Sequence, residues 1–158
     1  LTMIPRLDAF AAAPESMQAM LKLEQHVRDC GLEHSLIELV KIRASQINGC
    51  AYCIHMHTRD ARRAGETEER LYLLSAWRES PLYSPRERAA LAWTEALTRI
   101  ADTHAPDEDY AELRRHFTEA EAVQLTLLIG AINIWNRIAI GFRSVHPAES
   151  VPASTAAS

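Results

Sequence analysis

The stretch from Leu36 to Gly65 constrains the fold more than any other part of the chain, because it reads as two helices joined by a tight turn. Apolar residues recur at helical spacing before Asn48 and Gly49, a pair that tolerates the left-handed backbone in which helices commonly end. A second helical pattern begins directly after Gly49 and ends at Gly65, another good terminating residue. We therefore expect a helical hairpin with its turn at Asn48 and Gly49.

Two cysteines begin the second helix of this hairpin. Cys50 is expected at the N-cap or first position, and Cys53 follows three residues later. Free N–H groups and the positive end of the helix dipole stabilise anions at such a position, which favours the reactive thiolate form of cysteine. Cys50 is also close enough to Cys53 to form a disulfide. The spacing therefore predicts a redox-active dithiol.

A histidine and a glutamate complete the candidate site. His57 is four residues after Cys53 on the same helical face, where its imidazole can take the proton of that sulfur or hold the thiolate as an ion pair. At the helical rise of about 1.5 Å per residue, Glu38 lies roughly 13 Å before the turn and His57 roughly 10 Å after it. In an antiparallel hairpin the two would be neighbours, so Glu38 could orient the imidazole.

Each of these residues also has a structural alternative. The two cysteines with His55 and His57 could bind zinc, although structural zinc sites usually draw half of their ligands from a distant segment. His57 could instead be a hydrogen-bonded core residue. Ser35 to Glu38 also matches a capping box, in which the glutamate reaches back to the start of its own helix.

Three further residues near the dithiol are given structural roles. His55 points about 200° around the helix from Cys53 and is expected at the surface or at a subunit interface. Tyr52 is expected to form part of a pocket wall. Cys30 is expected to be a buried free thiol near the end of the preceding helix.

The run from Glu38 to Gly65, ELVKIRASQINGCAYCIHMHTRDARRAG, resembles the core signature of the AhpD-like alkylhydroperoxidases in the carboxymuconolactone decarboxylase superfamily. Weaker likeness continues through the helices after Ser84 to about Asn136. The resemblance implies an all-helical homo-oligomer, a trimer or a hexamer built from dimers, that reduces hydroperoxides through its dithiol.

The resemblance also implies a role for each site residue. Cys53 would attack the peroxide and become a sulfenic acid, and Cys50 would donate a proton and then close the disulfide. His57 and Glu38 would form the proton relay. One difference is Tyr52, which stands where the best-known members carry a further histidine.

Composition limits the classes of function. With 158 residues, 47% of them hydrophobic, the chain is long enough for one domain with a buried core. The net charge of −4 argues against a nucleic-acid-binding surface. Three cysteines, one pair in a redox spacing, and no secretory leader favour the cytoplasm. A dithiol donor must then supply electrons, with a lipoyl protein as one candidate, and we expect no cofactor and no bound metal.

Helix start and stop signals divide the rest of the chain. We expect an all-α, compact bundle of about six or seven helices that forms a single domain over residues 1–146, followed by a disordered tail over residues 147–158. Residues 1–13 are expected to form an arm across a neighbouring subunit. The helices outside the hairpin are expected over residues 14–30, 67–78, 84–102, 107–117 and 118–142.

The helix over residues 118–142 is apolar nearly all round. Gln124, Asn133, Asn136 and Arg137 interrupt it, which argues against a membrane span and for a buried central helix that also contacts other subunits. The last three of these polar residues are expected to form structural hydrogen bonds, with a place in the thiol pocket as the alternative.

Three functions follow from these patterns, in order. The first is a thiol-dependent peroxidase that reduces alkyl hydroperoxides in antioxidant defence. The second is a thiol–disulfide oxidoreductase with little peroxide activity, and the third is a metal-binding or purely structural helical module. A decarboxylation is disfavoured, because the dithiol would then have no purpose.

Overall fold

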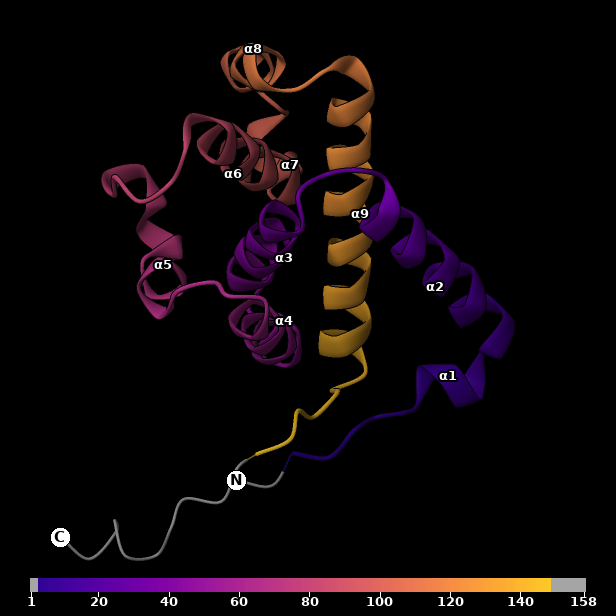
Figure 1. Ribbon diagram of the computed structural model, residues 1–158. Helices are drawn as coiled ribbons and strands as arrows, with labels where there is room; N and C mark the ends of the chain where they lie inside the picture. The colour runs from indigo at the N-terminus through magenta and orange to yellow at the C-terminus, as the bar shows by residue number, and fades with distance from the viewer. Residues whose placement is uncertain (1–2, 149–158) are drawn as a thin grey trace, which may run out of the picture.

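The computed structural model describes residues 3–148, and in that range every regular element is a helix (Figure 1). The expected all-α class is therefore confirmed. Six of these helices have ten residues or more, as expected, and shorter ones are added between them. The elements are α1 (Ala9–Ala12), α2 (Pro14–Asp29), α3 (His34–Asn48), α4 (Ala51–Arg63), α5 (Glu68–Tyr72), the 3-10 helix η1 (Leu74–Glu79), α6 (Pro85–Thr98), α7 (Ile100–Thr103), α8 (Asp107–His116) and α9 (Glu119–Gly141).

The long helix α9 forms the centre of the molecule, with α2 on one side and α3, α4 and α6 on the other (Figure 1). It begins at a capping box in which the Thr118 hydroxyl accepts from the N–H of Glu121 and the Glu121 carboxylate accepts from the N–H of Thr118. By length and composition alone α9 could cross a membrane, which is weak evidence. Its contacts with four other helices identify it as the expected central helix of the core.

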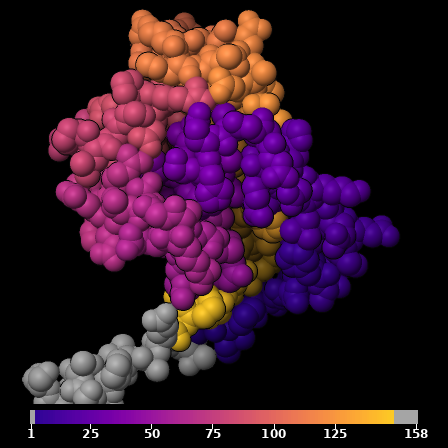
Figure 2. Space-filling model, viewed as in Figure 1, coloured from indigo at the N-terminus to yellow at the C-terminus, as the bar shows by residue number. Residues whose placement is uncertain are grey.

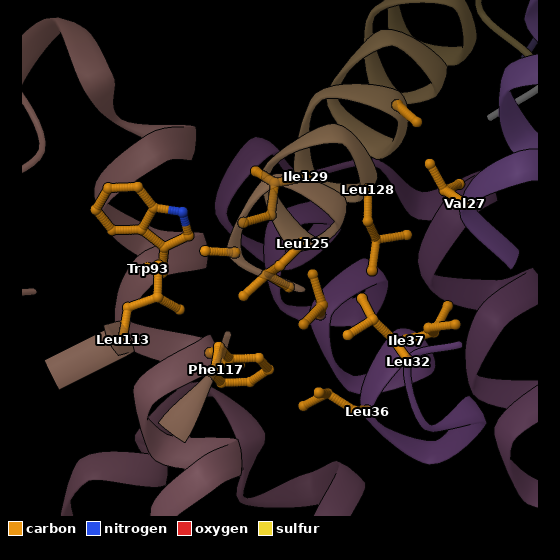
Figure 3. Close-up of a cluster of buried hydrophobic side chains, with 14 of the residues drawn as sticks. Val27, Leu32, Leu36, Ile37, Trp93, Leu113, Phe117, Leu125, Leu128 and Ile129 are labelled. Carbon is orange, nitrogen blue, oxygen red and sulfur yellow. The ribbon is translucent and has the colours of Figure 1, made fainter. Parts of the chain in front are cut away.

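One hydrophobic cluster fixes α9 against its neighbours (Figure 3). Leu125, Leu128 and Ile129 of α9 are almost completely buried and lie in one cluster with Val27 of α2 and Ile37 of α3. Full burial of such a side chain stabilises the fold by about 1.5–3 kcal/mol. The cluster therefore holds α3, which carries one side of the candidate site, in a fixed position on α9.

Two expected helices are interrupted. The helix expected over residues 67–78 ends at Tyr72, and η1 continues after it with a non-helical Ala76. Arg88 explains the change of path, because its guanidinium donates to the carbonyl groups of Trp77 and Ser80. The helix expected over residues 84–102 is divided at Arg99, whose ψ of 36° leaves the helical region. In both places contacts between elements override local helix propensity.

The two ends of the described chain are joined to each other. The backbone N–H of Arg6 donates to the carbonyl of Phe142 at 2.8 Å, and its guanidinium donates to the carbonyl of Gly141 at 3.0 Å. The N-terminal arm thus contacts the end of α9 of its own chain. The tail expected over residues 147–158 lies, from residue 149 on, outside the described residues.

Candidate functional site

The turn of the α3–α4 hairpin places the two cysteines. Gly49 adopts φ 71° and ψ 34°, the left-handed conformation expected of it, and caps α3. Cys50 is the N-cap residue of α4, and its Sγ accepts from the N–H of Cys53 at 3.3 Å. Both sulfurs therefore lie in the first turn of α4, as the sequence predicts.

Cys50 and Cys53 form a disulfide, with their Cα atoms 5.4 Å apart. The two residues are only 1% and 2% exposed. The expected pairing is thus present in the structure. Burial of the bond means that a reagent reaches these sulfurs through a cavity and not across an open surface.

Glu38 and His57 meet across the hairpin. Glu38 Oε2 lies 3.3 Å from His57 Nδ1, within ion-pair distance but outside the angles of a regular hydrogen bond. Both atoms are buried, and neither has another hydrogen-bond partner. The carboxylate therefore has the position from which it can orient the imidazole.

The capping-box alternative for Glu38 is wrong. Helix α3 begins at His34, and Glu33 is its N-cap residue without a side-chain capping bond. Ser35 consequently lies inside the helix, so Glu38 is not the third residue after a cap. The longer α3 leaves the Glu38 carboxylate free to face α4.

A cavity of about 560 Å³ lies in front of Cys53 and His57. Its walls come from the N-terminal arm, α2, α4 and the end of α9, and Figure 2 shows these segments meeting at the lower end of the molecule. Tyr52 lines the cavity, which confirms its expected place in a pocket wall. The volume is that of a site for a small organic molecule. Apolar side chains dominate the lining: Leu7, Phe10, Leu21, Tyr52, Met56, Trp135, Ile138 and Phe142.

A buried ion pair in the wall of this cavity was missed by the sequence analysis. Lys41, which is 1% exposed, donates to Glu24 Oε1 at 2.5 Å, and the indole of Trp135 donates to Glu24 Oε2 at 3.2 Å. Burial alone would raise the pKa of Glu24, but the hydrogen bonds from Lys41 and Trp135 and the charge of Arg28 together hold that pKa below its ordinary value. The one signal in the sequence was a lysine within an otherwise apolar helical face.

Two asparagines of α9 have structural roles. Asn48 donates to the side-chain oxygens of Asn133 and Asn136, each at 2.9 Å, and Asn136 donates to the Ser45 hydroxyl at 3.0 Å. These bonds attach the end of α3, just before the cysteine turn, to α9. The structural interpretation of Asn133 and Asn136 is therefore confirmed.

His55 and Cys30 lie apart from this arrangement. The ring of His55 stacks on that of His146, with centroids 4.5 Å apart. Cys30 is partly exposed, not buried as expected, because it ends α2, where its thiol donates to the carbonyl of Val27 at 3.2 Å. Within residues 3–148, no group of three or more His, Cys, Asp or Glu residues is placed to hold a metal ion.

Comparison with known proteins gives the family. The sequence profile of the carboxymuconolactone decarboxylase family matches residues 14–96. The uncharacterized protein YdfG of Bacillus subtilis is 47% identical over 138 residues, which cover 87% of this chain and 94% of YdfG. The same likeness is present in solved structures.

A crystal structure from Agrobacterium tumefaciens, of a protein of unknown function described as a candidate antioxidant defence protein AhpD, is similar with a TM-score of 0.90 and 51% identity. The match covers 92% of this chain and 100% of that one. The debrominase Bmp8 shares the fold, with a TM-score of 0.80 and 23% identity over 88% of this chain and 75% of Bmp8. The match of the family profile to more than half of the chain, together with these relatives, shows that the chain belongs to the carboxymuconolactone decarboxylase family, in its AhpD-like branch.

Proposed function

We propose that this protein is a thiol-dependent peroxidase that reduces alkyl hydroperoxides through a dithiol–disulfide cycle of Cys50 and Cys53. One arrangement carries the proposal. The disulfide lies in the first turn of α4, and Cys53 faces the apolar cavity together with His57, whose far side contacts Glu38.

In the oxidative step, the Cys53 thiolate attacks one peroxide oxygen. A sulfur–oxygen bond forms and the O–O bond breaks, so that sulfur is oxidised to the sulfenic acid and the peroxide is reduced to an alkoxide. The alkoxide takes a proton from the His57 imidazolium and leaves as the alcohol. Glu38 stabilises the charged imidazole until that transfer.

In the resolving step, the sulfur of Cys50 attacks that of Cys53. The disulfide forms, the sulfur–oxygen bond breaks, and the hydroxyl leaves as water with the proton of Cys50. A dithiol donor then reduces the disulfide and is itself oxidised, and a lipoyl group is a donor of suitable chemistry. We place this cycle in the cytoplasm and in a homo-oligomer, a trimer or a hexamer.

Burial favours this function over general thiol–disulfide exchange. Both cysteines are at most 2% exposed, so a folded protein substrate has no direct approach to the disulfide. A small hydroperoxide or a donor on a flexible arm can enter the 560 Å³ cavity. The likeness to the Agrobacterium protein described as a candidate AhpD supports the same choice.

Thiol counting tests the proposal. The reduced chain has three cysteines, and a few equivalents of cumene hydroperoxide should leave one free thiol. The Cys30→Ser variant should still lose two thiols, whereas Cys53→Ser should lose none at the same rate. Survival of all thiols, with rapid loss to a small disulfide such as oxidised lipoamide, would favour the thiol–disulfide oxidoreductase instead.

A further inference from the structure

A second cavity lies behind the Glu38–His57 pair. Its volume is about 360 Å³, and its lining includes His34, Glu38, Glu66 and Arg70. His57 lines the cavity of the dithiol, and Glu38 lines this second one. The pair therefore connects two separate spaces, one beside the sulfurs and one behind them.

His34 extends the chain of ionisable groups from this second cavity to the surface. It lies one turn before Glu38 on α3, with its Nε2 3.9 Å from Glu38 Oε1, and its side chain is 58% exposed. Glu38 Oε2 faces the other way, 3.3 Å from His57 Nδ1. His34, Glu38 and His57 thus form a continuous series from solvent to the cavity that holds Cys53.

The remaining charged groups of the second cavity are not proton carriers. Arg70 donates to Glu66 at 2.8 Å and to Glu87 at 2.5 Å. The hydrogen bond with Glu87 raises the pKa of Arg70 further above its ordinary value, so the guanidinium stays charged. Glu66 is held by that fixed cation, which leaves His34 as the group in this cavity suited to exchange protons near neutral pH.

The catalytic cycle needs such an exchange once in each turnover. A donor attacks a disulfide as its thiolate, and the proton of that thiol has already passed to water. The donor therefore returns both electrons but only one of the two protons that the peroxide consumes. The second proton must come from solvent and reach His57 before the next alkoxide leaves.

We propose that His34 is the outer end of the proton relay and that it passes this solvent proton through Glu38 to His57. This inference rests on the proposed peroxidase function. Peroxide and donor enter through the cavity of Cys53, and protons enter through the cavity of His34. The 3.9 Å gap exceeds a hydrogen bond, so the proton crosses it when the exposed imidazole rotates or through one water molecule.

A glutamine in place of His34 tests the relay, because it keeps a polar side chain of similar length but cannot carry a proton. His116→Gln is the matched control: His116 and Glu112 form the same one-turn pair on α8, with Nε2 3.1 Å from Oε1. Two rates are compared in dilute buffer with cumene hydroperoxide. They are the single-turnover oxidation of the reduced protein and the steady-state turnover with reduced lipoamide.

The relay predicts that His34→Gln keeps the single-turnover rate and lowers steady-state turnover on the order of tenfold, at the low end of what a proton-transferring group contributes. Added imidazole should restore turnover, because His34 is accessible, and His116→Gln should behave as the parent.

Two results would overturn the relay: turnover of His34→Gln equal to that of the parent in dilute buffer, or an equal loss of both rates that imidazole does not restore. Failure of the parent itself to react with the peroxide would instead remove the proposed function, and the relay with it.

Discussion

Oε2 of Glu38 and Nδ1 of His57 lie 3.3 Å apart, both buried, and each is the other's nearest charged partner across the α3–α4 hairpin. A carboxylate at Nδ1 fixes the tautomer and orientation of an imidazole and leaves Nε2 for the cavity side. His57 lines the cavity that Cys53 also lines. Four predictions and one decisive measurement follow from this contact and from its surroundings.

His57 should control the ionisation of Cys53. Replacing His57 by alanine removes the base, so alkylation of Cys53 by iodoacetamide should need a higher pH than in the parent. The measurement is the rate of alkylation against pH in the reduced Cys50→Ser background. His55→Ala is the control, because the ring of His55 stacks on His146. Superimposable profiles for His57→Ala and the parent would exclude His57 as the base.

Glu38→Gln should lower the rate of Cys53 oxidation by up to about 100-fold, because the amide neither stabilises the imidazolium nor fixes its tautomer. Stopped-flow oxidation by cumene hydroperoxide measures this rate. Glu33→Gln, at the more exposed N-cap of the same helix, should leave the rate near that of the parent. If the two variants react at the same rate, Glu38 has no part in the relay.

The buried pair of Lys41 and Glu24 should contribute to stability only as a pair. Glu24→Gln leaves the ammonium of Lys41, which is 1% exposed, without its counter-ion, and should lower the free energy of unfolding by about 3 kcal/mol. Adding Lys41→Met should recover much of that loss. Urea unfolding measures both effects, and a single variant as stable as the parent would show that the pair is not needed.

Acid should weaken the fold partly through Glu24. Its pKa in the folded state is below the ordinary 4.5, so the stabilisation is present above that pH and is lost as the pH falls through the lowered value. The parent should therefore lose more stability than Glu24→Gln between about pH 6 and pH 3. Other carboxylates, such as Glu87, titrate alike in both proteins. Parallel curves of unfolding free energy against pH would contradict this assignment.

Local signals were sufficient to predict the hairpin and its dithiol. Asn48 and Gly49 end one helix, and Cys50 begins the next, because turn and cap geometry depend on a few adjacent residues. The contact of Glu38 with His57 followed from a length count along two helices. His34 was also within reach of such an argument, since it lies one turn before Glu38.

The remaining features depend on contacts that the local sequence does not contain. Glu24 and Lys41 are on different helices and meet because both α2 and α3 pack on α9. The interruption of the expected helix over residues 67–78 depends on Arg88, which lies beyond it in the sequence. Helix propensity is a weak guide where such long-range contacts compete with it.

Trapping of the sulfenic acid tests the central claim, the attack of Cys53 on peroxide, most directly. The reduced Cys50→Ser variant, treated with one equivalent of cumene hydroperoxide and then with dimedone, is digested and analysed by mass spectrometry. The proposed cycle predicts a dimedone adduct on Cys53 and none on Cys30, while the parent yields the Cys50–Cys53 disulfide without adduct. An unmodified Cys53 in that variant, or an adduct on Cys50 in the reciprocal Cys53→Ser variant, would contradict it.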